Sequence, residues 1–164
     1  MIISEKLSQE LEKILSGDAW YGPAVHETID KISFEIAYER PGNGAHSIAE
    51  IVLHMLGWTI EVSERLNDKT ATLPAGGDWP DAGTPDEERW KTMVNDLKLA
   101  NVNLIGLIEK FPESKWGELT NDDRNEPGLG AGVNYEQLIN GLIQHHVYHA
   151  GQIGILNRML GGVV

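Results

Sequence analysis

Cysteine is absent from this chain of 164 residues. Its absence excludes disulfide bonds, thiolate ligands to a metal and a cysteine nucleophile. The redox state of the compartment is left open.

Basic residues are scarce relative to acidic ones. The chain has 13 lysines and arginines against 25 aspartates and glutamates, which gives a formal net charge of −12. Nucleic-acid backbones require a basic surface, and here the basic residues are scattered among acids. We therefore expect no nucleic-acid partner, and we attribute the acidity to solvated helix surfaces.

Long hydrophobic runs are also missing. No stretch approaches the roughly 18 apolar residues of a membrane span, and the first residues, MIISEKLSQE, lack the basic-then-apolar order of a signal peptide. We expect a cytoplasmic protein with no membrane partner. The length and the 41% hydrophobic content predict a single globular domain over residues 1–164.

Helical periodicity dominates what is present. Three segments carry the capping-box pattern of a helix start, namely Ser47–Glu50, Thr84–Glu87 and Asn134–Gln137. Apolar residues recur at helical spacing behind each start, and an N-terminal stripe ends at Gly17 and resumes after Pro23. Four amphipathic segments that share one core predict an all-α four-helix bundle. Two long loops rich in glycine and proline, 68–83 and 112–132, are of a length that often borders functional sites.

Three of the six histidines lie in the segment QHHVYHAGQ, residues 144–152. At about 100° per residue, His145 and His149 are about 40° apart and share the leucine stripe that should face the core. His146 lies about 100° from His145, so we expect it at the rim. Histidines four residues apart are stacked neighbours, and this is the spacing at which two imidazoles share a metal.

A third imidazole, His54, borders the core-facing stripe of the helix that starts at Ser47. A catalytic zinc site typically has three protein ligands and a water, so His54 would complete the set. The alternative is that each histidine is a core or boundary residue without a ligand role. For His145 and His149 a common partner is favoured, because two adjacent buried imidazoles lose the hydration of their nitrogens.

Two motifs carry a resemblance to a known family. The core histidine followed by an aromatic residue in HMLGW, together with HHVYHAGQ near the C-terminus, resembles the DinB-like superfamily of small bacterial four-helix bundles. The segments DAWYGPAVHETID, GAHSIAEIVLHMLGW and GDWPDAGTPDEERW extend the likeness over most of the chain. The resemblance implies that His54, His145 and His149 bind zinc or nickel and that the protein forms a homodimer. Tyr21 stands where one branch often has histidine, outside this triad.

Three neutral imidazoles would leave the metal its full charge and an open coordination position. Such an ion activates water, polarises a carbonyl or holds the thiolate of a low-molecular-weight thiol. We therefore predict a metal-dependent enzyme that acts on a small-molecule substrate, of the hydrolase type or of the small-thiol S-transferase type that the family resemblance implies. Glu61, Glu50 and Tyr148 are the candidate general bases, and Gln152 is a candidate for orienting a ligand. The alternative is a non-catalytic bundle that binds a metal or a small molecule.

Overall fold

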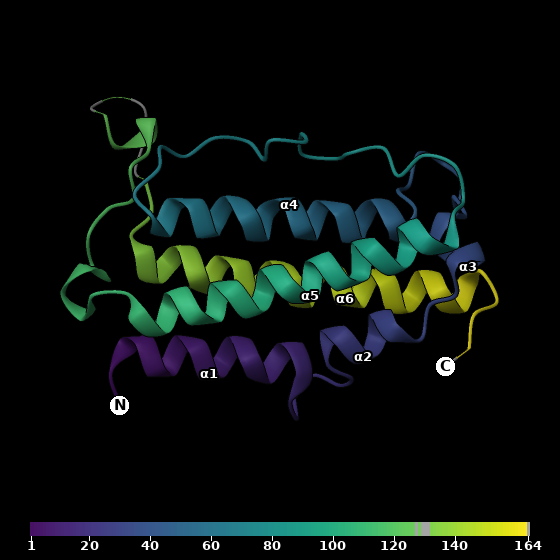
Figure 1. The fold of residues 1–164 in the computed structure, drawn as a ribbon, viewed down its shortest axis with the longest axis horizontal. Coiled ribbons are helices and arrows are strands. Elements are labelled where there is room, and N and C mark those ends of the chain that lie inside the picture. The colour runs from purple at the N-terminus through teal and green to yellow at the C-terminus, as the bar shows by residue number, and fades with distance from the viewer. Residues whose placement is uncertain (127, 129–131, 164) are drawn as a thin grey trace.

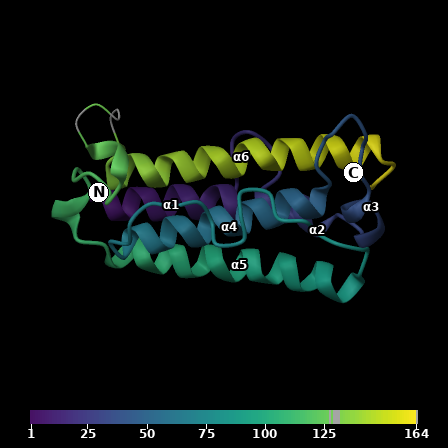
Figure 2. The same cartoon turned by 90° about the horizontal axis from the view of Figure 1, so that it is seen from above.

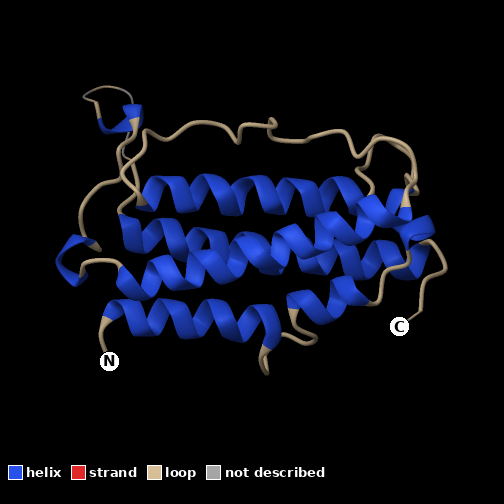
Figure 3. Cartoon of the chain, viewed as in Figure 1, coloured by secondary structure: helices blue, strands red, loops and turns tan. Residues whose placement is uncertain are grey.

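The computed structural model describes residues 1–126, 128 and 132–163. Helices account for all the regular secondary structure of this described part, and Figures 1 and 3 show their arrangement. The α-helices are α1 (Ile3–Ser16), α2 (Val25–Asp30), α3 (Phe34–Tyr38), α4 (Ile48–Leu66), α5 (Glu87–Lys110) and α6 (Tyr135–Met159), and two short 3-10 turns are η1 (Glu113–Lys115) and η2 (Asp123–Asn125). The all-α prediction is confirmed.

Four rods of helix form the bundle. Helices α4, α5 and α6 are three of them, and α1 with α2 makes the fourth, interrupted after Gly17. Helix α4 packs against α5 and α6, and α1 packs against the same two helices from the other side. Figure 2 shows these helices lying side by side with their long axes aligned. The interruption agrees with the N-terminal stripe, because Val25 and Ile29 of α2 are buried beyond the break.

Two of the three expected helix starts have the predicted chemistry. The Ser47 hydroxyl accepts from the Glu50 amide at 3.2 Å while the Glu50 carboxylate accepts from the Ser47 amide at 2.8 Å. Asn134 and Gln137 make the same reciprocal pair at the start of α6, at 2.8 and 3.0 Å. Each pair satisfies amides that the first turn of a helix leaves without partners.

The start predicted at Thr84 was wrong by two residues. Helix α5 begins at Glu87, and its cap is Asp86, whose carboxylate accepts from the Arg89 amide at 2.8 Å. Aspartate caps a helix at least as well as threonine. The chain therefore stays extended through Asp86, and the helix begins at the next residue, Glu87.

The core is built from the predicted apolar stripes. Every rod contributes fully buried aliphatic side chains, which include Leu7, Leu11, Ile29, Ile48, Met55, Leu97, Leu104, Ile139 and Ile153. Burying one such side chain contributes about 1.5–3 kcal/mol. Trp116, which follows α5, is also fully buried, and its indole N–H donates to the Ser4 hydroxyl at 2.9 Å. This contact closes one end of the bundle.

The connection between α4 and α5, residues 67–86, runs back along the outside of α4 (Figure 1). We call it the strap. It is fastened near its start, because the Thr72 amide donates to Glu61 at 2.8 Å and the Thr72 carbonyl accepts from Arg65 at 3.0 Å. Further along, the strap reaches His54 of α4, because the Asp78 carbonyl oxygen lies 2.6 Å from Nδ1 of that histidine. Among the described residues, no helix is both long enough and apolar enough to cross a membrane.

Candidate metal centre

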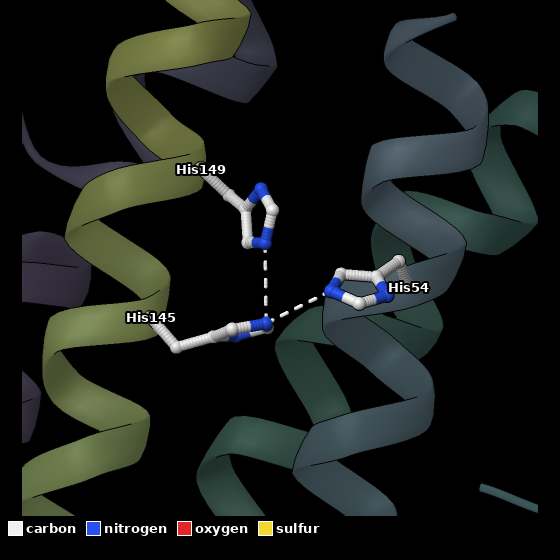
Figure 4. Close-up of side chains that lie close together, drawn as sticks. All are labelled: His54, His145 and His149. Atoms are coloured by element: carbon white, nitrogen blue, oxygen red, sulfur yellow. Dashed lines mark hydrogen bonds between the residues drawn. The ribbon is translucent and has the colours of Figure 1, made fainter. Parts of the chain in front are cut away.

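Three imidazoles from two helices converge in the bundle. His54 comes from α4, and His145 and His149 come from successive turns of α6 (Figure 4). The Nε2 atom of His145 lies 2.9 Å from Nε2 of His54 and 3.1 Å from Nε2 of His149. One ring nitrogen of each histidine lies within 4.8 Å of the others. The structure therefore brings together the three histidines that the sequence indicated.

The outer nitrogens fix the protonation of two of these rings. Nδ1 of His54 lies 2.6 Å from the carbonyl oxygen of Asp78, and Nδ1 of His149 lies 2.6 Å from Oε1 of Gln152. Both partners are acceptors, so each Nδ1 carries the hydrogen and each Nε2 presents a lone pair. His145 has at most one hydrogen on Nε2 to offer to two acceptors. At least one pair of nitrogens therefore faces lone pair to lone pair at about hydrogen-bond distance.

A cation at the centre resolves that conflict. Two nitrogens that are each about 2.0–2.1 Å from one zinc ion lie about 2.9–3.4 Å apart, for angles between about 90° and 110° at the metal. The Nε2 separations of 2.9 Å between His54 and His145 and of 3.1 Å between His145 and His149 fall in that interval. The donor set and its spacing thus fit a divalent transition metal.

Burial favours the neutral form of the two α6 imidazoles. Burial, with the neighbouring His149 and His54, lowers the pKa of His145 to about 4. Burial is also the main cause of the lowered pKa of His149, and its contact with Gln152 acts in the opposite direction. A neutral imidazole is the form that binds a metal. The environment therefore favours the ligating form of both α6 histidines.

The strap adds two residues that the sequence reasoning did not single out. The indole of Trp79 stacks on both sides, with ring centroids 3.7 Å from His46 and 3.8 Å from His54 and interplanar angles of 3° and 5°. The Asp78 carboxylate accepts from the Trp58 indole at 2.8 Å and lies 3.2 Å from Nδ1 of His54. An aspartate and a tryptophan in the middle of a loop rich in glycine and proline were the available signal.

The candidate orienting residue and the candidate general bases lie in different surroundings. Gln152 contacts His149, as the prediction of an orienting group requires. Tyr148 is 64% exposed, and its ring centroid lies 5.1 Å from that of His149. Glu61 is buried two helical turns from His54, where it accepts from Arg65 at 2.9 Å and from Thr72. Glu61 thus fastens the strap and does not join the histidine cluster.

Glu50 is likewise held away from the cluster. Its carboxylate caps the Ser47 amide and pairs with Arg40. The capping role that the sequence predicted accounts for this residue.

The prediction that His146 lies at the rim was wrong. Its side chain is 0% exposed, and its Nε2 lies 2.9 Å from Oδ1 of Asn101 and 3.3 Å from the Thr59 hydroxyl. Helix α6 packs against α1, α2 and α4, so it buries more of its circumference than one stripe. His146 therefore faces the core beside the cluster, while His145 and His149 face α4.

Comparison with known proteins bears on the fold. No protein-family model and no curated protein matches the sequence. Among solved structures, a DinB-like protein from Bacillus cereus ATCC 10987 superposes with a TM-score of 0.66 over 99% of this chain and 93% of that chain, at 13% sequence identity. Identity at this level establishes similarity of fold alone, and the four observed rods accord with it. The chain has the fold of a DinB-like protein.

Proposed function

We propose that His54, His145 and His149 hold one divalent transition metal ion, zinc or nickel, and that the protein is a metal-dependent enzyme. The observation that carries the proposal is the convergence of three Nε2 atoms. Asp78 and Gln152 accept from the Nδ1 hydrogens of His54 and His149, so the Nε2 atoms of these two rings carry no hydrogen and present lone pairs. A structural zinc site has four protein ligands. Among the described residues the cluster stops at three, which favours a position open to water or substrate.

When bound, the metal would lower the pKa of water, polarise a carbonyl or hold a small thiolate. We propose a hydrolase or a small-thiol S-transferase acting on a small molecule. The protein's part is to orient the ligands. The Asp78 carbonyl and Gln152 fix the two Nδ1 hydrogens, and hydrogen bonds of this kind stabilise metal sites. Glu61 acts indirectly by fastening the strap, and Tyr148 stands beside His149 as the candidate group for contact with substrate.

Metal content is the first test. Protein expressed in metal-replete medium should contain about one equivalent of zinc or nickel per chain by elemental analysis. His54→Ala should lose it, whereas His26→Ala, which removes an imidazole outside the cluster, should retain it. Wild-type protein that stays metal-free and also refuses added zinc and nickel would contradict the proposal.

Turnover is the second test. The metal-loaded protein should be assayed with small thiols paired with electrophiles, and separately with esters and amides. Activity that is lost in His54→Ala and kept in His26→Ala supports an enzyme. A stoichiometric metal without turnover in any pairing favours the alternative, a bundle that binds metal or small molecules without catalysis.

We also propose that the protein is a homodimer that uses the outer face of α6. Ile155 and Met159, four residues apart, are exposed on one side of this helix. Exposed apolar groups that gather on one face are typical of interfaces. Light scattering after size-exclusion chromatography should give twice the chain mass, and Ile155→Glu should halve it. Leu99→Glu, an exposed leucine on α5, is the matched control and should leave the mass unchanged.

A further inference from the structure

A groove of about 310 Å³ between α4 and α6 begins at His145. Its walls are mainly apolar and include Trp58, Val62, Leu138 and Leu142. The groove is lined by His145, one of the three clustered histidines, and lies between the two helices that carry them. The groove is therefore placed to hold the part of a substrate that does not react.

The length of the groove follows from helix geometry. Along α6 it extends from His145 back to Gln137. Eight residues at 1.5 Å per residue correspond to about 12 Å. The groove thus accommodates an elongated molecule with one end at the histidines.

The far end of the groove is polar and nearly neutral. Arg65 lines it, and the guanidinium donates from Nε to Glu61 at 2.9 Å and from Nη2 to the Thr72 carbonyl at 3.0 Å. Among the described residues Nη1 makes no hydrogen bond, so it is the nitrogen left to donate to a ligand. Because the Glu61 carboxylate already neutralises Arg65, and because the chain carries a net charge of −12, little attraction remains for an anion.

We propose that this groove is the substrate-binding site and that it selects an uncharged, largely apolar molecule about 12 Å long. The reacting group lies at the His145 end, and a carbonyl or hydroxyl oxygen at the other end accepts from Arg65. This proposal rests on the proposed function, since it assigns the substrate class of the same centre. Each methylene buried between the apolar walls should strengthen binding about fourfold.

Linear amides test the proposal by calorimetry on the purified protein, with the metal content measured in the same preparation. Affinity should rise about fourfold per methylene from butanamide to octanamide and then level off for chains longer than the groove. Octane-1-sulfonate, of similar length but anionic, should bind more weakly than octanamide in EDTA-treated protein, where no cation at the histidines attracts the anion. Affinity independent of chain length, or tighter binding of the sulfonate, would overturn the proposal.

Two glycine variants localise the binding. Gly141 lines the groove, and a Cβ added there meets no atom within 4 Å, so the side chain of Gly141→Leu starts in free space beside the groove. Gly106 on α5 is equally open and does not line the groove, which makes Gly106→Leu the matched control. Octanamide binding should fall at least tenfold in Gly141→Leu and stay unchanged in Gly106→Leu.

Equal affinity in both glycine variants would place the binding elsewhere. Amide binding that follows the groove in protein that contains no metal and takes up no added zinc or nickel would support the groove while contradicting the metal centre. The two proposals therefore fail separately.

Discussion

Exchange of His146 for alanine should separate core packing from metal binding, and His149→Ala is its counterpart. His146 is fully buried and follows one of the proposed ligands directly in the chain, yet its ring contacts Asn101 and Thr59 and does not reach the cluster. We expect His146→Ala to destabilise the fold and to keep the metal. We expect His149→Ala to lose the metal at a smaller cost to the metal-free fold.

The cost of His146→Ala can be worked from its contacts. Truncation of a fully buried ring costs about 3–5 kcal/mol through lost contacts and the cavity that remains. The amide oxygen of Asn101 also loses its donor, which adds about 1–3 kcal/mol. The wild-type ring already leaves its own Nδ1 without a partner among the described residues, and removal of that buried group offsets part of the loss. We therefore expect a net loss of about 3–5 kcal/mol in the free energy of unfolding.

Urea unfolding of EDTA-treated protein, followed by circular dichroism, measures that loss. Elemental analysis of metal-loaded protein, at a temperature where each variant is folded, measures the stoichiometry. His146→Ala should keep about one equivalent and His149→Ala should keep almost none. If the alanine variant does not fold, His146→Gln, which retains an amide next to Asn101, replaces it. Equal metal loss in folded variants of both positions would refute the geometric reasoning.

Three further predictions concern the surroundings of the cluster. Burial lowers the pKa of His146 to about 3, from an unfolded value near 6.5. The unfolded chain therefore binds the extra proton, and the free energy of unfolding of metal-free protein should fall by about 2–3 kcal/mol between pH 6.5 and 4.5. In His146→Leu, urea titrations should show a smaller loss over the same pH range. Trp79→Leu removes a ring stack on His54 worth about 1 kcal/mol and should weaken zinc binding about fivefold in chelator competition. Trp20 is 98% exposed, so Trp20→Leu is the control and should leave the zinc affinity unchanged. Equal zinc affinities in the two variants would contradict the role of the strap. Gln152→Leu should weaken zinc binding about 10–100-fold, and Gln152→Glu, which keeps an acceptor for His149, should restore it. An unchanged zinc affinity in Gln152→Leu would contradict the orienting role.

Local signals in the sequence predicted most of the helical architecture. The capping pairs at Ser47 and Asn134 occur as predicted, because a cap depends on residues within one turn of the chain. The short helix α3 was not predicted, since five residues carry too little periodicity to be recognised. The prediction of one domain over residues 1–164 and that of a cytoplasmic protein stay predictions. The second long loop, 112–132, lies partly outside the described residues.

The candidate site divides in the same way. Spacing along α6 placed His145 and His149 on one face, because the helical period is fixed by the backbone and needs no knowledge of neighbours. The same reasoning misplaced His146, because burial on a second face depends on how many helices surround α6. Helical spacing also could not connect His54 with Asp78 or Trp79, because these two residues lie 24 and 25 positions further along the chain.

The sequence by itself determined the long helices, their main apolar faces and the pairing of two imidazoles within one helix, since each of these follows from interactions between residues a few positions apart. Only the tertiary structure decided that His54 meets that pair, that the strap supplies Asp78 and Trp79, and that a groove leads from His145 to Arg65. Those contacts join segments far apart in the chain. They arise from the packing of whole helices, and no local periodicity encodes them.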